Sequence, residues 1–229
     1  MKKQINIAVI PARSGSKRIK NKNIKLFFSK PMIAWTIESL KKSKLYDKIV
    51  VTSDSQKILN ISKKSKADIL IKRPKILSGD RSKIDDAMQH AIKYMELKFK
   101  INLKIVSCFF PCNPFLRKKE LILAHKILKK KNNGFILSVT KYKHPIQRAY
   151  TLEKKNNYIE PKNKKSFSMM TQDFLENYHD AAQFYVANKK TWFVREKKKF
   201  GVVIPIWRSV DIDDSDDWKN AELLFKSLI

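Results

Sequence analysis

The sequence is short of glycine, cysteine and histidine. Its 229 residues include 4 glycines, 2 cysteines and 4 histidines. The two cysteines, Cys108 and Cys112, lie in one short segment, and with so few histidines they do not supply the ligands of a zinc site. We therefore expect reduced thiols in a cytoplasmic protein. No apolar run approaches the ~18–20 residues of a membrane span, and no apolar leader precedes the first strand-like run, so we expect neither membrane insertion nor secretion.

Arginine is also scarce, and this decides how the large positive charge is interpreted. The chain carries 50 Lys and Arg against 21 Asp and Glu, a formal net charge of +29, but only 8 of the cations are Arg. Arg, rather than Lys, dominates base recognition and bidentate phosphate contacts. We therefore expect a solvated lysine surface and no nucleic-acid partner. A basic nucleic-acid-binding protein is the alternative from another class, and it predicts steeply salt-dependent binding to any DNA or RNA.

The chain does contain enough apolar residues, 43% of the total, for a packed core. Near-continuous apolar runs, typical of strands that are buried on both faces, occur at residues 5–11, 48–54, 68–72, 104–111 and 134–140. Amphipathic segments with helical spacing separate or follow them, as at 84–95, 121–128 and 218–228. This alternation predicts one α/β domain, residues 1–229, with a mainly parallel sheet. Ligands bind at the carboxyl ends of such strands, which here are the loops after Pro11, Asp54 and Pro111.

The segment 141–180 departs from this pattern. It is polar, rich in Lys and Asn, and only weakly periodic. Two interpretations remain open: a flexible lid, or an insertion that pairs with a partner subunit. Strand character resumes at 183–187 and 201–206, so we expect the chain to return to the same sheet.

The loop after the first predicted strand has the composition of a phosphate-binding loop. It combines small residues with five cations: Ala12, Arg13, Ser14, Gly15, Ser16, Lys17, Arg18, Ile19, Lys20, Asn21, Lys22 and Asn23. With Gly15 as its one glycine it is neither a P-loop nor a dinucleotide fingerprint. Small residues still let backbone N–H groups approach phosphate oxygens, while Arg13, Lys17 and Lys22 can neutralise a triphosphate. The alternative is an ordinary basic surface loop.

An acidic cluster near the end of the chain stands out against the basic composition. Asp211 and Asp213 flank Ile212, so in a strand both carboxylates would project to one face. Two adjacent carboxylates repel each other, and a hard cation such as Mg²⁺ would relieve that repulsion. The four residues that follow, 214–217, are suited to capping the last helix.

A third cluster places several hydrogen-bonding side chains at the entrance to a strand. Its members His179, Asp180, Gln183 and Tyr185 together form a candidate contact surface for a polar small molecule. A lone histidine is more often structural, and the grouping of four such residues favours ligand contact.

These motifs resemble one family. Residues 10–23, with Lys30-Pro31, resemble the nucleotide-binding opening of the CMP-sialic acid synthetases (acylneuraminate cytidylyltransferases). Residues 73–80 resemble the second nucleotide loop of that family, and Asp211-Ile212-Asp213 resembles its metal-binding pair. Residues 172–185 are most similar to the branch that acts on pseudaminic acid. The resemblance spans essentially the whole chain.

The resemblance implies a Rossmann-like three-layer nucleotidyltransferase fold, with 141–180 as a small dimerisation insertion that packs on a second copy. It implies transfer of CMP from CTP to a nonulosonic acid, with Mg²⁺ as cofactor and pyrophosphate as the second product. The implied catalytic residues are Arg13, Lys17, Lys22 and Asp211, and the implied metal ligands are Asp211 and Asp213. The implied nucleotide contacts are Ala12, Arg13, Ser14, Gly15, Ser16, Lys17, Asn23, Arg73, Asp80 and Ser82. The implied sugar contacts are Gln172, His179, Asp180, Gln183 and Tyr185.

The chain also departs from the family pattern. Ser14, Ser29 and Ala182 stand where glycine is usual. The serines are small enough to allow phosphate binding, although a position that needs a positive φ would cost more with Ser than with Gly. Phe110 stands where members specific for sialic acid carry glutamine, which disfavours sialic acid as the substrate. The alternatives are the same reaction on sialic or legionaminic acid, and a catalytically inactive relative.

Overall fold

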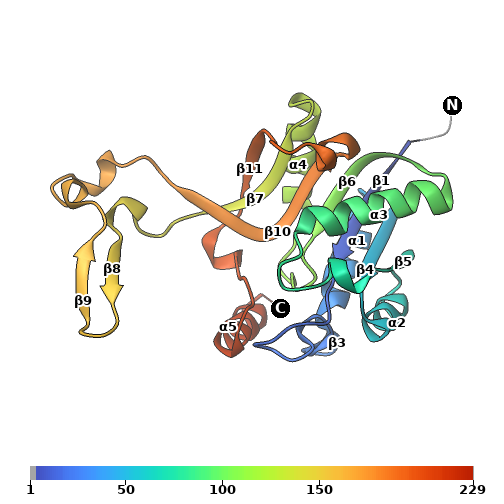
Figure 1. The fold of residues 1–229 in the computed structure, drawn as a ribbon, viewed down its shortest axis with the longest axis horizontal. Coiled ribbons are helices and arrows are strands. Elements are labelled where there is room, and N and C mark those ends of the chain that lie inside the picture. The colour runs from blue at the N-terminus through green and yellow to red at the C-terminus, as the bar shows by residue number, and fades with distance from the viewer. Residues whose placement is uncertain (1–3, 229) are drawn as a thin grey trace.

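A computed structural model describes residues 4–228, and its centre is a twisted seven-stranded sheet (Figure 1). The strand order is β11-β7-β10-β6-β1-β4-β5. In chain order the strands are β1 (Gln4–Pro11), β4 (Lys48–Ser53), β5 (Ile69–Lys72), β6 (Asn102–Phe109), β7 (Phe135–Lys141), β10 (Tyr178–Asn188) and β11 (Lys199–Val203). Strand β10 runs antiparallel to both its neighbours, β6 and β7, whereas the remaining neighbours pair in parallel. The mainly parallel α/β sheet predicted from the sequence is therefore confirmed.

Helices cover both faces of the sheet and make a three-layer structure. They are α1 (Met32–Ser43), α2 (Gln56–Lys64), α3 (Ile84–Phe99), α4 (Lys118–Lys130) and α5 (Ser215–Lys226). One face packs on α1, α2 and α4 through a core that includes Ile10, Ile37 and Leu121. The other face packs on α3, where Met88 and Ile92 meet alternate side chains of the same strands. This division follows from the pleat, because successive residues of a strand point to opposite faces.

A third hydrophobic core holds α5 against the hairpin that follows the loop of residues 12–23. Helix α5 packs on the short hairpin of β2 (Leu26–Phe27) and β3 (Lys30–Pro31), where Phe27 makes edge-to-face contacts with Trp218 and Phe225. Asp214 caps α5, since its side chain accepts hydrogen bonds from the N–H groups of Asp216 and Asp217. The capping role predicted for this part of the acidic cluster is thus confirmed. Through Ile212, the same core anchors the segment just before α5. This segment carries Asp211 and Asp213.

Residues 142–177 form an arm that extends away from the body of the protein (Figure 1). It contains the hairpin of β8 (Tyr150–Glu153) and β9 (Tyr158–Pro161) and three short 3-10 helices, η3 (Ile146–Arg148), η4 (Lys164–Phe167) and η5 (Thr171–Asp173). Strand β10 then carries the chain back into the central sheet, as the sequence predicted.

Trp207 lies outside the core, because it is 47% exposed. It lies in the 3-10 turn η7 (Ile206–Arg208), beyond the end of β11. Among residues 4–228, no helix is long and apolar enough to cross a membrane.

Candidate active site

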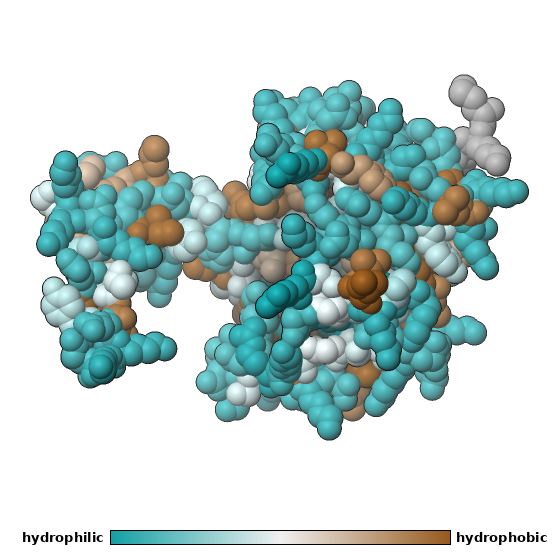
Figure 2. All heavy atoms as spheres, in the orientation of Figure 1, coloured by the Kyte–Doolittle hydropathy of each residue, from teal (hydrophilic) through white to brown (hydrophobic). Residues whose placement is uncertain are grey.

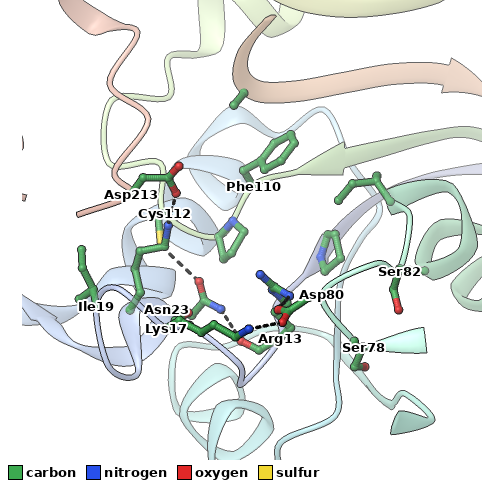
Figure 3. Close-up of a pocket in the computed structure, with 18 of the residues that line it drawn as sticks. Arg13, Lys17, Ile19, Asn23, Ser78, Asp80, Ser82, Phe110, Cys112 and Asp213 are labelled. Carbon is green, nitrogen blue, oxygen red and sulfur yellow. Dashed lines mark hydrogen bonds and ion pairs between the residues drawn. The ribbon is translucent and has the colours of Figure 1, made fainter. Parts of the chain in front are cut away.

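A cavity of about 680 Å³ opens at the carboxyl ends of the parallel strands (Figure 3). Its walls come from the loops after β1, β5 and β6, from the start of α3, from Ala182 in β10, and from Val210, Asp211 and Asp213. Two of the three loops predicted from strand polarity line it directly, those after Pro11 and Pro111. The third, after Asp54, supports the cavity from behind, as described next. The volume is in the range typical of small-molecule sites.

Asp54 anchors the phosphate-binding loop from outside the cavity. Its carboxylate accepts a hydrogen bond from the backbone N–H of Ser14 (2.9 Å) and another from the Ser14 hydroxyl (2.5 Å). Burial raises the pKa of Asp54, but the hydrogen bonds from Ser14 and the nearby charge of Arg73 outweigh it, so the pKa falls below its ordinary value. Sequence reasoning pointed to the loop after Asp54 but missed this residue's role, which depends on a contact across 40 positions.

The loop does not need the glycines that are usual in the family. The backbone φ of Ser14 and that of Ser29 are not positive, and neither is the φ of Gly15. Asn21, at φ 57°, makes the left-handed turn instead. The buried Asn23 donates from Nδ2 to the carbonyl of Arg13 (2.8 Å) and so ties the two ends of the loop together. Serine is therefore tolerated at position 14 and gains a hydrogen bond that glycine lacks.

The predicted cations lie on the cavity wall. Arg13 and Lys17 both contact the carboxylate of Asp80, at 2.7 and 2.5 Å (Figure 3). Hydrogen bonds from Lys17 and Arg13 hold the pKa of the Asp80 carboxyl below its usual value. The loop after β1 is thereby linked to the loop after β5 across the cavity. An anionic ligand would compete with Asp80 for the same two cations.

Arg73 is a buried cation at the start of the loop after β5. Its residue is 4% exposed, and its Nε donates to the Ser78 hydroxyl (2.9 Å). Within the described part of the chain, no hydrogen bond or ion pair engages its two terminal nitrogens. Burial lowers the pKa of this guanidinium, an effect that the charge of Asp54 partly offsets. A buried arginine with free donors at a cavity is suited to binding an anionic or carbonyl oxygen. Ser82 lines the same wall.

Asp211 and Asp213 both line the cavity, while Ile212 between them is 1% exposed and packs into the core under α5. The expected alternation therefore holds, although these residues form no strand. Burial and repulsion from Asp213 raise the pKa of Asp211. Burial also raises the pKa of Asp213, but hydrogen bonds and attraction from Lys22 and Arg18 outweigh it and the net shift is downward.

This pair fits a hard divalent cation. Mg²⁺ is commonly bound through one or two carboxylates together with substrate phosphates, rather than in an all-protein cage. The described residues contain no cluster of three or more His, Cys, Asp or Glu that could form such a cage. Arg18 (2.6 Å) and Lys22 (3.1 Å) pair with Asp213, so these cations lie beside the acidic pair. Arg18 is a site residue that the sequence analysis named in the loop without assigning it a role.

The predicted sugar contacts are placed differently. Of the described residues, those that line the cavity do not include Gln172, His179, Asp180, Gln183 or Tyr185. Gln183 is buried, and its side chain donates to the carbonyl of Arg208 (2.8 Å). His179 packs on the ring of Tyr142 (4.8 Å between centroids) at the base of the arm. Gln172 lies on the arm and lines a second, smaller cavity there.

Strand β10 is irregular where it borders the cavity. Its pairing with β7 shifts register between Asp180 and Tyr185, and Ala182 within this bulge has φ 49°. An L-residue other than glycine is strained in that region by about 1–2 kcal/mol. Asp180 supports the bulge by accepting a hydrogen bond from the N–H of Ala182 (2.8 Å). Of the three positions where glycine is usual, Ala182 is thus the one that is strained.

A family model, related sequences and a solved structure all relate this chain to enzymes that use CTP or transfer CMP. A sequence model described as cytidylyltransferase matches residues 7–224. The chain is 34% identical, over 96% of each chain, to the pseudaminic acid cytidylyltransferase of Campylobacter jejuni subsp. jejuni serotype O:23/36 (strain 81-176). It is 29% identical to an N-acylneuraminate cytidylyltransferase of Escherichia coli O18:K1:H7, covering 94% of this chain and 51% of that protein. Its fold is similar to that of a CMP:2-keto-3-deoxy-manno-octonic acid synthetase complexed with CTP, with a TM-score of 0.70 at 13% identity over 99% and 100% of the two chains.

Proposed function

Because the chain belongs to the cytidylyltransferase family, we propose that it transfers CMP from CTP to a nine-carbon α-keto acid sugar, pseudaminic acid, and releases pyrophosphate. One observation supports this most strongly. A single cavity places the cations of the loop after β1 close to the acidic pair Asp211 and Asp213, with the buried Arg73 in a further wall. This arrangement offers separate places for a triphosphate, a divalent cation and a base.

In the proposed reaction the anomeric hydroxyl of the sugar acid attacks the α-phosphorus of CTP. A bond forms between that oxygen and phosphorus, and the proton of the hydroxyl passes to solvent. The bond from the α-phosphorus to the bridging oxygen breaks, and pyrophosphate leaves with the electron pair. Arg13, Lys17 and Lys22 hold the triphosphate and the leaving group, so they contribute by positioning and by charge stabilisation. Lys22 is itself held by the carbonyl of Ile212 and by Asp213.

Asp211 and Asp213 are the proposed ligands of Mg²⁺. When bound, this ion would neutralise charge on the phosphate oxygens and lower the pKa of the attacking hydroxyl. Asp213 already forms ion pairs with Arg18 and Lys22. The pKa of Asp211 is raised, so its charged form is the one that a bound cation would stabilise most. The proposed need for Mg²⁺ is tested by removing the ion with a chelator, which should stop turnover, and by adding Mg²⁺ again, which should restore turnover.

The proposed nucleotide contacts divide between two walls. Arg13, Ser16, Lys17 and Asn23 line the part of the cavity proposed for the phosphates. Arg73 and Ser82 line the part proposed for the cytosine and ribose. The other predicted nucleotide contacts of the loop, Ala12, Ser14 and Gly15, are not among the lining residues. The side chains of Arg13 and Lys17 form ion pairs with the Asp80 carboxylate. When CTP binds, these two cations would leave Asp80 and pair with phosphate oxygens instead.

A homodimer is part of the proposal. The arm exposes apolar side chains, including Leu152, Tyr158, Ile159 and Met170, each more than half exposed. Figure 2 shows brown apolar residues spread through this lobe. A two-stranded hairpin is marginally stable alone, so a second copy would cover this surface and stabilise it. The arm, with Gln172, would then contribute to the sugar site of the other subunit. We further propose that the enzyme acts in the cytoplasm.

The test of the reaction is pyrophosphate release by the purified chain with Mg²⁺, CTP and one sugar acid at a time. Pseudaminic, legionaminic and sialic acids are compared, with ATP, GTP and UTP as nucleotide controls. Release with CTP and pseudaminic acid supports the proposal. Release with sialic or legionaminic acid instead keeps the reaction and changes the substrate. No release with any sugar acid contradicts the proposed function.

A further inference from the structure

The segment that carries the acidic pair has no regular secondary structure. Residues 209–213 lie between the 3-10 turn η7 and helix α5. Within residues 4–228, no backbone–backbone hydrogen bond involves Val210, Asp211 or Ile212. The direction in which Asp211 and Asp213 point must therefore be set by the contacts that anchor the two ends of this segment.

The end of the segment next to α5 is anchored by its neighbours in sequence. Ile212 packs into the third hydrophobic core. The Asp217 carboxylate accepts hydrogen bonds from the backbone N–H groups of Asp213 (2.9 Å) and Asp214 (3.1 Å). These contacts fix the chain that follows Asp211, but they do not fix the chain that leads into it.

The other end is anchored by Arg208, three positions before Asp211. The Arg208 side chain is 1% exposed and forms an ion pair with Glu120, at the start of α4, whose side chain is 7% exposed. A second guanidinium nitrogen donates to the carbonyl of Phe115 (3.4 Å). The backbone carbonyl of Arg208 in turn accepts from Nε2 of Gln183 in β10 (2.8 Å). Arg208 is therefore held through both its side chain and its backbone.

A buried ion pair of this kind is a weak source of stability. The cost of removing two charges from water offsets most of their attraction, and apolar side chains of similar volume often stabilise a fold equally well. The pair is also incompletely bonded, because Arg208 Nε and Glu120 Oε2 have no hydrogen-bond partner in the described part of the protein. A guanidinium supplies directional bonds in a fixed plane, which an apolar side chain cannot do. Positioning therefore explains this ion pair better than stability does.

We infer that Arg208 is a positioning residue for Asp211 and Asp213, and that Glu120 and Gln183 act through it. This inference rests on the proposed function. Among the described residues, those that line the cavity do not include Arg208, Glu120 or Gln183, so they act from behind the site. Residues that orient metal ligands in this way typically contribute about 10- to 100-fold to metal affinity or activity. The buried Gln183 thereby has a role in the metal site rather than in sugar contact.

The test measures the binding of Mn²⁺, a paramagnetic ion that suits the same oxygen ligands as Mg²⁺, to the full chain. CTP is present and the sugar acid is left out, so no CMP is transferred. The enhancement of water proton relaxation reports the ion that is bound to the protein, because the complex of protein, CTP and Mn²⁺ tumbles more slowly than Mn²⁺ with CTP alone. The affinity for CTP itself is measured by calorimetry in EDTA.

The main variant replaces both members of the ion pair, Arg208→Met with Glu120→Leu. Removal of Glu120 alone would leave the charge of Arg208 buried and unpaired and would destabilise the fold, whereas the double replacement should melt close to the wild type. Its affinity for Mn²⁺ should fall by about 10- to 100-fold. The matched control is Lys189→Met with Glu96→Leu, which removes an ion pair (2.6 Å) between α3 and the turn after β10 and should bind Mn²⁺ as the wild type does.

Gln183→Met tests the backbone anchor separately. It removes the hydrogen bond to the carbonyl of Arg208 and leaves the ion pair in place. The affinity for Mn²⁺ should fall by about 2- to 10-fold, the equivalent of one hydrogen bond. The affinity for CTP in EDTA should keep its wild-type value in every variant, because the inference concerns only the metal ligands.

The outcomes distinguish the inference from the function on which it rests. Wild-type affinity for Mn²⁺ in the double variant overturns the inference alone; if that variant does not fold, Gln183→Met decides in the same way. Equal losses of Mn²⁺ binding and of CTP binding in EDTA also overturn it, because they indicate a structural role. An absence of Mn²⁺ binding by the wild type with CTP contradicts the proposed metal site, and the inference falls with it.

Discussion

The proposed site has two halves, a nucleotide half (residues 12–23 with Asp211 and Asp213) and a sugar half (residues 172–185). Both were predicted from equally polar sequence motifs, but the structure places their side chains differently. In the nucleotide half, the side chains of Arg13, Lys17 and Lys22 reach the cavity from one loop. In the sugar half, the polar side chains of Asp180 and Gln183 bond to backbone groups of the protein. The difference shows that a cluster of polar residues can be a binding surface or a scaffold. Which one it is depends on whether the backbone nearby has unsatisfied groups.

The largest expected effect tests the acidic end of the nucleotide half. Asp211→Asn should reduce turnover by about 10³-fold, because it removes a charged ligand of the proposed Mg²⁺ site. The melting temperature should change little, since Asp211 contributes no core packing. The matched control is Asp216→Asn, in the same acidic cluster but on the exposed side of α5, which should retain activity. Full activity of Asp211→Asn with Mg²⁺ would refute the metal assignment.

The next effect concerns the cations of the same half. Arg13→Gln should raise the KM for CTP by about 10-fold or more, since it removes a charged hydrogen-bond donor to phosphate. Lys20→Gln is the control, because Lys20 belongs to the same loop but lies outside the cavity lining. Steady-state kinetics at fixed ionic strength measures both variants. Equal effects of the two substitutions would indicate a nonspecific basic surface rather than a built phosphate site.

A pair of glycine substitutions compares the two halves directly. Ala182→Gly should stabilise the protein by about 1 kcal/mol, because it relieves the strain at φ 49° by more than the added entropy of the unfolded chain. Ser14→Gly should instead destabilise by about 1 kcal/mol, since the hydroxyl bond to Asp54 is lost without relieving any strain. Urea denaturation measures both. Stabilisation by both variants would mean that the loop at Ser14 is also strained.

The smallest expected effect is the pH dependence of the Asp54 anchor. The folded-state pKa of Asp54 is lowered, so its contribution to stability is present above the unfolded value of about 4 and is lost as pH falls through the folded-state pKa. The free energy of unfolding should therefore fall less between pH 7 and pH 3 in Asp54→Asn than in the wild type. Equal losses in the two proteins would show that the anchor does not form in solution.

Much of the fold could be predicted because local patterns determine it. The apolar runs at residues 5–11 and 48–54 correspond to β1 and β4. The antiparallel direction of β10 could not be predicted, because it depends on the path of the chain through the arm. The exposure of Trp207 could not be predicted for a related reason. The apolar character of the residue does not reveal that β11 ends at Val203 and that the next turn leaves the core.

The site was predictable only where its residues are neighbours in sequence. The loop of residues 12–23 was identified from its composition. The role of Asp54 depends on its contact with Ser14. The Gln183 side chain is turned inward to donate to the carbonyl of Arg208, which is 25 positions away in the sequence. Such contacts arise from strand order and helix packing, which a motif does not contain. Ala182 was named as a departure from glycine, but the sequence did not predict that it is strained, nor that the φ of Ser14 is ordinary.

The central claim is that this cavity joins CMP to a sugar acid, and product analysis tests it most directly. The purified chain is incubated with CTP, Mg²⁺ and pseudaminic acid, and CMP-sugar is measured by mass spectrometry beside pyrophosphate. The account predicts equal molar amounts of both products, and about 10³-fold slower formation of both by Asp211→Asn. Pyrophosphate without CMP-sugar, or equal yields from wild type and Asp211→Asn, would contradict it.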